Sequence, residues 1–169
     1  MISPALYMSR TDEWPTPCAL FNELNAEFAF TLDPCASLQN AKCRTFFTKA
    51  DDGLRQDWTK HRVFCNPPYG KTMRNWAQKC FEASQQGATV VLLAHSRTDT
   101  RWFHDWVYGK AELRFIKGRL KFGDGAQSAP FPSLIAVYRH RPRANETPPH
   151  LRGGVGKWPS PQFSIPPRA

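Results

Sequence analysis

The sequence contains no long apolar run and no recognisable set of metal ligands. No stretch approaches the roughly 20 consecutive apolar residues that a membrane-spanning helix needs. The N-terminus has no basic region followed by an apolar run, so no secretory signal peptide is expected. The five cysteines include no Cys-x-x-Cys pair and no paired Cys/His spacing, which argues against zinc and suits buried free thiols in a reducing compartment. We therefore expect a cytoplasmic protein that neither enters a membrane nor binds a metal.

Acidic residues are scarce relative to basic ones. The formal net charge is +9 and the pI is about 9.6, which favours a polyanionic partner. Part of this charge lies near the C-terminus, because the residues from Arg139 onward include six Lys/Arg and one Glu. Residues 141–169 are also rich in proline, so we expect a disordered basic tail behind one domain over residues 1–140. A generic basic protein with a solvated tail is the alternative that charge leaves open.

Apolar runs and helical patterns alternate along residues 16–138 at the spacing of βαβ units. A first helix is expected over 19–28, with Thr16 as its N-cap and Pro17 at its first position. The expected strands cover 28–32, 44–48, 62–65, 88–94, 113–116, 120–122 and 133–138, and the further helices cover 36–43, 73–86 and 100–108. This order predicts an α/β three-layer sandwich with a mostly parallel sheet and an antiparallel strand late in the chain.

The stretch Asn66-Pro67-Pro68-Tyr69 directly follows the strand expected at 62–65. A polar side chain, two prolines and an aromatic ring are poor material for a core. Both prolines fix φ near −65° and lack a backbone donor, so this turn is rigid. Open α/β sheets bind ligands at the carboxyl ends of their strands. The turn therefore marks the candidate functional edge of the sheet, although prolines and glycine also punctuate ordinary turns.

An ordered set of short motifs surrounds this turn, and the set resembles the phage-type (Dam-like) DNA N6-adenine methyltransferases. The matching pieces, in the family's order, are DEWPTP (12–17), LDPCA (32–36), NAK (40–42), DDGL (51–54), NPPYG (66–70), RTDTRWF (97–103) and GRLKF (118–122). The resemblance implies a compact Rossmann-like methyltransferase fold that uses S-adenosylmethionine. It also implies methyl transfer to the N6 amino group of an adenine that is flipped out of double-stranded DNA.

The chemistry explains why this turn needs these residue types. The amino group of adenine is a poor nucleophile, because its lone pair is delocalised into the ring. The Asn66 side-chain oxygen and the Pro67 carbonyl can accept hydrogen bonds from that group and stabilise the positive charge that develops on nitrogen. Pro68 completes the rigid turn, and Tyr69 offers a ring on which the target base can stack. We expect these four residues to form the catalytic site.

The resemblance also suggests where the cofactor binds. Thr16 and Pro17 are implied near its methionine end, while Asp33 and either Asp51 or Asp52 are candidates for its polar groups; of the last two, Asp51 is slightly favoured. The expected cofactor-binding set is Trp14, Thr16, Pro17, Asp33, Pro34, Ala36, Asp51, Asp52 and Asn66.

One feature departs from most methyltransferases, which carry a glycine-rich turn after their first strand. Gly53 is the only glycine before Gly70. Two explanations are open. Either Asp33 ends the first strand of the fold and the segment 34–36 bends there without glycine, or Asp33 is the acidic residue of the second strand and the first strand is shortened or lost.

The DNA contacts have a weaker signal. Arg97, Arg101, Arg119 and Lys121 lie on or beside loops expected at the active-site edge, and ordinary surface charge is the alternative for each. The loop at 123–132 and the residues after Ala94 are the candidates for target readout. Rival functions are methylation of cytosine N4, RNA or protein glutamine, and a non-catalytic DNA-binding protein that keeps a decayed methyltransferase fold. The oligomeric state and the target sequence are not predicted.

Overall fold

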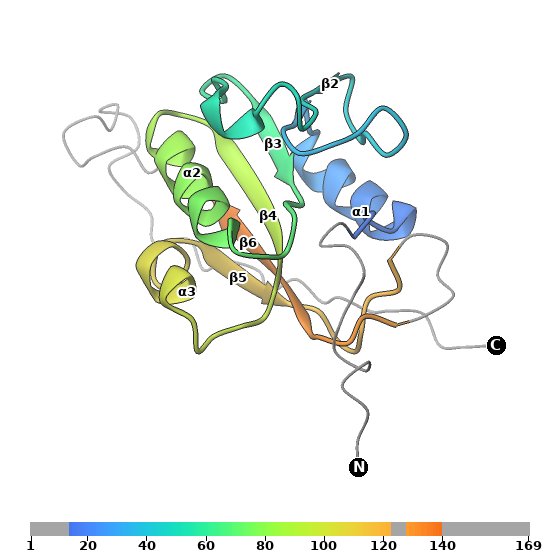
Figure 1. Cartoon of the computed structure of the whole chain (residues 1–169), viewed down its shortest axis with the longest axis vertical. Coiled ribbons are helices and arrows are strands. Elements are labelled where there is room, and N and C mark those ends of the chain that lie inside the picture. Colours follow the sequence, from blue (N-terminus) through green and yellow to red (C-terminus); the bar gives the residue numbers. More distant parts are fainter. Residues whose placement is uncertain (1–13, 123–127, 140–169) are drawn as a thin grey trace, which may run out of the picture.

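The computed structural model describes residues 14–122 and 128–139. Six strands form one sheet in the spatial order β2-β1-β3-β4-β6-β5, with helices packed beside it (Figure 1). In chain order the elements are α1 (Cys18–Phe28), β1 (Leu32–Asp33), β2 (Thr45–Phe46), the 3₁₀ turn η2 (Gly53–Arg55), β3 (Arg62–Cys65), α2 (Met73–Gln85), β4 (Thr89–His95), α3 (Arg101–Trp106), β5 (Glu112–Phe115) and β6 (Ser133–Tyr138).

The sheet is mostly parallel, and β6 runs antiparallel to both of its neighbours, β4 and β5. This confirms the prediction of a late antiparallel strand. Strands β1 to β5 consequently all point the same way, and the residues that follow them emerge at one edge of the sheet. We call this the carboxyl edge. At this edge the polar residue Asp33 ends β1, and the polar residue Asn66 directly follows β3.

The two faces of the sheet pack against different helices. Val91 and Leu93 of β4 pack in one apolar cluster with Leu24 of α1, whereas Val90 and Leu92 pack in a second cluster with α2 and α3. Figure 1 shows the same division, with α1 on one side of the sheet and α2 and α3 on the other. The continuous apolar run of β4 is therefore covered on both faces, as a central strand of an α/β sheet requires.

Several local predictions were wrong. Helix α1 has Pro17 as its N-cap residue, and no side chain caps it, so Thr16 does not have the capping role expected of it. Residues 36–43 form turns instead of a helix, in which the Asn40 side chain accepts a hydrogen bond from the Ser37 backbone amide. Asparagine and serine compete for backbone groups in this way, which disfavours a helix.

The first strand is shorter than predicted, and the short strand expected at 120–122 is absent from the described residues. Strand β1 is only two residues long, because Ala29 takes a left-handed conformation (φ 48°) and the Phe30 amide is tied to the Asn25 side chain. Residues 120–122 do not form a strand, although the Leu120 carbonyl accepts a hydrogen bond from Ala129.

Three predicted regions lie wholly or partly outside the described residues. They are the N-terminal residues 1–13, part of the loop at 123–132 and the expected tail at 141–169. Within the described part of the chain, no helix is long and apolar enough to cross a membrane.

Candidate active site

A cleft of about 920 Å³ opens at the carboxyl edge, and its lining comes from segments far apart in sequence. The N-terminal residues 14–16 form one wall, and the loops after β1 and β2 form another. Asn66 and Pro68 line it after β3, and Trp76 lines it from α2. Its volume lies near the upper end of the roughly 300–1,000 Å³ range for small-molecule sites. The cleft is large enough for a cofactor of nucleoside size.

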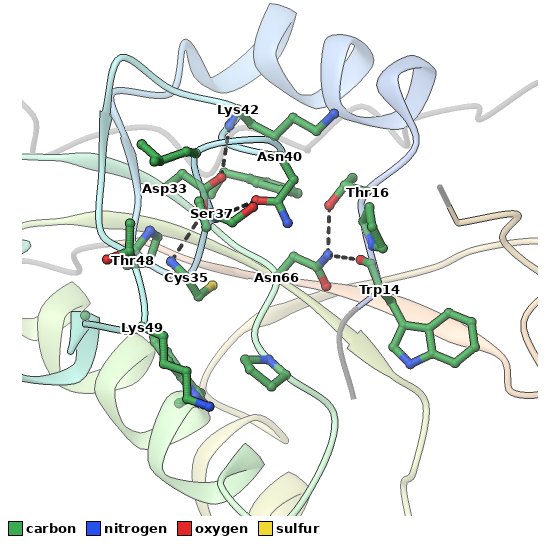
Figure 2. A pocket seen from close by; sticks show the side chains of 18 of the residues that line it. Trp14, Thr16, Asp33, Cys35, Ser37, Asn40, Lys42, Thr48, Lys49 and Asn66 are labelled. Atoms are coloured by element: carbon green, nitrogen blue, oxygen red, sulfur yellow. Dashed lines mark hydrogen bonds between the residues drawn. The ribbon is translucent and has the colours of Figure 1, made fainter. Parts of the chain in front are cut away.

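Asp33 is a buried residue of the cleft lining and organises the turn that follows β1. Its two carboxylate oxygens accept hydrogen bonds from the backbone amides of Cys35 (3.4 Å) and Lys42 (3.1 Å), which Figure 2 shows. Burial raises the pKa of Asp33, and these two amides oppose the rise because they stabilise the charged form. Asp33 thus holds the 34–42 loop in place where a glycine-rich turn is absent.

The glycine that the site needs comes from a different segment. Gly53 of η2 packs so closely on the turn after β1 that a Cβ at this position would lie 1.9 Å from the Pro34 carbonyl oxygen. The Gly53 carbonyl accepts a hydrogen bond from the buried Trp58 indole (3.0 Å), which fixes η2 against the core. Close approach of two backbones is one of the roles for which only glycine fits. Gly53 therefore allows η2 to pack directly against the turn after β1.

This arrangement also places Asp33 in the sheet. Asp33 ends β1, the first strand of the described residues, which lies between β2 and the strand β3 that leads to Asn66. Asp33 and Asn66 consequently follow adjacent parallel strands and line the same cleft.

The side-chain amide of Asn66 has a fixed orientation. Its nitrogen Nδ2 donates to the Trp14 carbonyl (2.6 Å) and to the Thr16 hydroxyl oxygen (2.9 Å) (Figure 2). Its oxygen Oδ1 is buried and has no hydrogen-bond partner among the described residues. A buried acceptor without a partner is costly unless a ligand supplies the donor. Asn66 therefore presents a free acceptor, as binding of an amino group requires.

Tyr69 lies in an aromatic cluster next to this turn. Its hydroxyl donates to the Leu93 carbonyl of β4 (3.3 Å), and its ring centroid lies 5.1 Å from that of His95 and 5.4 Å from that of Phe131. Burial raises the pKa of Tyr69 well above its usual value, so the phenol is neutral. The hydroxyl hydrogen bond and the tilted and edge contacts with neighbouring rings give the Tyr69 ring a defined orientation.

His95, the first of the residues after Ala94 considered for target readout, also belongs to this cluster. Its imidazole contacts Tyr69, Trp102 and Phe131, and its Nδ1 atom is buried without a partner among the described residues. Burial and the nearby Arg97 charge lower the pKa of His95 to about 4, against which Asp99 acts weakly. At neutral pH the imidazole is uncharged, so it acts here as a polar ring inside an aromatic cluster.

The residues predicted to be catalytic or to bind the cofactor divide into two groups. Trp14, Thr16, Asp33, Pro34, Ala36, Asp52, Asn66 and Pro68 line the cleft, whereas Pro17, Asp51, Pro67 and Tyr69 do not. Asp51 instead accepts hydrogen bonds from the backbone amide and hydroxyl of Thr48, which lowers its pKa. The structure thus places Asp52, and not Asp51, on the cleft.

Several residues that line the cleft were not predicted as site residues. Ser37, Leu38, Lys42, Lys49 and Trp76 line it. Lys42 lay inside a family motif and Trp76 in the helix expected at 73–86, but Ser37, Leu38 and Lys49 carried no signal, because loop residues have no periodicity that shows which way they face.

The four predicted DNA-binding residues are all exposed. Arg97 and Arg101 follow β4, and Arg119 and Lys121 follow β5, which runs parallel to β4. All four therefore belong to segments that leave the sheet at the carboxyl edge, where the cleft opens. Arg97 forms a loose ion pair with Asp99 (3.7 Å), which an incoming phosphate could replace.

Fold and site together define a class: an α/β protein with a methyltransferase-like sheet and a ligand cleft beside an Asn-Pro-Pro-Tyr turn. Comparison with known sequences gives the family. The model of the family described as "DNA N-6-adenine-methyltransferase (Dam)" matches residues 5–140. The chain belongs to this family.

Two relatives show how far the similarity extends. The DNA N-6-adenine-methyltransferase of Haemophilus phage HP1 (strain HP1c1) is 30% identical over 110 residues, which cover 64% of this chain and 64% of the phage protein. The "Putative methyltransferase YfdM" of Escherichia coli (strain K12) is 38% identical over 65 residues, which cover 34% of this chain and 71% of that protein. The chain thus matches somewhat less than two thirds of the phage relative's length.

Proposed function

We propose that this protein is a DNA methyltransferase that transfers a methyl group from S-adenosylmethionine to the N6 amino group of adenine. The observation that carries the proposal is the buried Asn66 Oδ1 atom, which has no partner among the described residues while both amide hydrogens are engaged. An adenine amino group supplies the donor that this acceptor lacks. The family match and the phage relative's described activity support the same conclusion.

The reaction needs little acid–base chemistry from the protein. Bound S-adenosylmethionine would supply an electrophilic methyl group. Asn66 Oδ1 and the Pro67 carbonyl accept hydrogen bonds from the adenine amino group, which directs its lone pair away from the ring system. Both acceptors also stabilise the positive charge that develops on nitrogen. A proton is then lost from the methylated nitrogen to solvent, since neither Asn66 nor Pro67 is basic.

The other parts of the site position the reactants. Tyr69 gives the flipped adenine a surface for stacking, because its ring is fixed through the Leu93 carbonyl and Phe131. The cofactor occupies the cleft, with Asp33 holding the loop at its base and Asp52 among the polar lining. Trp14, Thr16, Pro34 and Ala36 complete this site, whereas Pro17 is the N-cap residue of α1 behind Thr16 and Asp51 acts through the Thr48 turn. The mixture of carboxylate, amide, lysine and apolar lining suits a molecule with a base, a sugar and an amino-acid end.

Double-stranded DNA approaches the carboxyl edge in this proposal. Arg97, Arg101, Arg119 and Lys121 contact its phosphates, which positions the duplex without reading its sequence. The proposed architecture is a compact three-layer methyltransferase domain over residues 1–140, followed by the basic segment 141–169. The proposed location is the cytoplasm, where the chromosomal or phage DNA lies.

The test compares methyl transfer by the wild type with that of Asn66→Ala. Labelled S-adenosylmethionine and unmethylated DNA are supplied, and the modified base is identified by mass spectrometry of nucleosides. We expect N6-methyladenine from the wild type and a loss of at least about 100-fold in kcat for the variant, since an acceptor aimed at the developing charge is removed.

The matched control is Asn75→Ala, which changes an exposed asparagine on α2. It should retain wild-type activity. Cofactor affinity, measured by calorimetry, should survive in Asn66→Ala. Methylation of cytosine, RNA or a glutamine peptide in place of adenine would refute the substrate assignment, and a wild type that binds DNA without turnover would refute the enzyme assignment.

A further inference from the structure

The orientation of the Asn66 amide depends on a segment 50 residues earlier in the chain. Its two N–H groups point at the Trp14 carbonyl and the Thr16 hydroxyl oxygen, at 2.6 and 2.9 Å. A carbonyl can only accept, so rotation of the amide by half a turn would set two oxygens against each other. We propose that Thr16, together with the Trp14 backbone, is a positioning residue that aims Asn66 Oδ1 at the substrate amine. This inference rests on the proposed function.

The surroundings of Thr16 favour this role over a structural one. Thr16 is 6% exposed, so water has little access to replace its hydroxyl. The side chain does not cap α1, because that helix has Pro17 as its N-cap residue and no side-chain cap. Its hydroxyl thus faces the amide that the chemistry needs and not the helix that follows it. A buried hydrogen bond of this kind restricts rotation of the amide about its terminal torsion, which is otherwise soft.

The same segment lines the cleft. Trp14, Pro15 and Thr16 form one of its walls, and Asn66, the first residue of the catalytic turn, also lines it and is hydrogen-bonded to Trp14 and Thr16. Contact with the cofactor and orientation of Asn66 are therefore separable roles of Thr16. Loss of a cofactor contact raises the KM for S-adenosylmethionine. Loss of orientation lowers kcat at saturating cofactor, because a misplaced acceptor affects the step in which the adenine amine is held and not the binding of the cofactor.

The test uses Thr16→Val, which keeps the shape of the side chain and removes the acceptor, and Thr16→Ser, which keeps the hydroxyl. We expect Thr16→Val to lower kcat at least about 10-fold, with the KM for S-adenosylmethionine and the melting temperature little changed. Thr16→Ser should recover most of kcat. The matched control is Thr89→Val at the start of β4, on the opposite edge of the sheet, which should retain wild-type kinetics.

A second measurement does not depend on turnover. The side-chain amide protons of Asn66, assigned by their loss in Asn66→Ala, should exchange slowly with solvent in the wild type and in Thr16→Ser. They should exchange at least about 10-fold faster in Thr16→Val, since one hydrogen bond is gone. This readout also serves if Thr16→Val is poorly active for another reason; if it does not fold, Thr16→Ala replaces it in both experiments.

The outcomes separate the inference from the proposed function. If the wild type methylates adenine and Thr16→Val raises only the KM for S-adenosylmethionine, or leaves both constants and amide exchange unchanged, the positioning role is wrong and the function stands. If the wild type does not methylate adenine while amide exchange responds as expected, Thr16 orients Asn66 and the proposed function is wrong.

Discussion

Gly53→Ala offers a direct test of how the cofactor cleft is built. An alanine Cβ at this position would lie 1.9 Å from the Pro34 carbonyl oxygen and 3.0 Å from its carbon. Because Cβ contacts below 3.0 Å are essentially never found, the two segments must separate by about 1.1 Å, the difference between 3.0 and 1.9 Å. The obstructing atom is backbone, so no side-chain rotation can relieve the overlap. The turn after β1 or η2 must move.

Both segments line the cleft, so the displacement should affect stability and binding together. Forced repacking of this kind costs about 1–3 kcal/mol. For a protein of this size that corresponds to a fall of roughly 2–12 °C in melting temperature. Movement of the Pro34 turn by about an ångström should also weaken S-adenosylmethionine binding at least 10-fold by calorimetry, given the roughly 100-fold losses that such misplacement can cause.

The matched control is Gly109→Ala. Gly109 has a positive φ of 71°, and nothing lies within 4 Å of a Cβ built on it. This variant should cost about 1 kcal/mol through its backbone conformation alone, with cofactor affinity unchanged. A Gly53→Ala protein that melts and binds S-adenosylmethionine like the wild type would show that Gly53 does not shape the cleft.

Two further predictions concern charge. The pKa of His95 is lowered from 6.5 to about 4, so the folded state favours the neutral ring and loses stability as the pH falls through this interval. Because the ring is partly exposed, we expect His95→Gln to remove only about 1–2 kcal/mol of that acid destabilisation, measured by urea unfolding at pH 7 and 4.5; an unchanged pH dependence would contradict it. Arg101→Ala should raise the KM for DNA and reduce the slope of log affinity against log salt by about 1, whereas Lys60→Ala, on the turn before β3, should do neither. Equal slopes for wild type and Arg101→Ala would remove Arg101 from the DNA interface.

The sequence by itself indicated where the main strands lie along the chain and that the sheet is mostly parallel with one late antiparallel strand. The apolar run at 88–94 was long and uninterrupted, which predicts a central strand covered on both faces, and β4 has this form. The turn after β3 was also predicted from local sequence, because two prolines after a buried strand fix the backbone and indicate a rigid turn. The ordered motifs around Asn66 then carried the family.

Short elements were predicted poorly, for a local reason. Strand β1 has two residues, and its neighbourhood is decided by Ala29 in a left-handed conformation and by the Asn25 side chain. A helix was expected over the segment 36–43, but the Asn40 side chain there accepts a hydrogen bond from the Ser37 backbone amide. Such competition between local hydrogen bonds and a helix leaves no periodic signal.

Only the tertiary structure decided how the site is assembled. Trp14 and Thr16 meet Asn66 across 50 residues or more, Gly53 meets the Pro34 turn, and Asp52 lines the cleft where Asp51 does not. Each of these contacts joins loops whose relative positions follow from the packing of the strands beneath them. Periodicity reports which face of an element is buried, but it carries no information about which loop meets which. The sequence could therefore identify the catalytic turn, whereas the hydrogen bonds that aim its asparagine are a property of the folded chain.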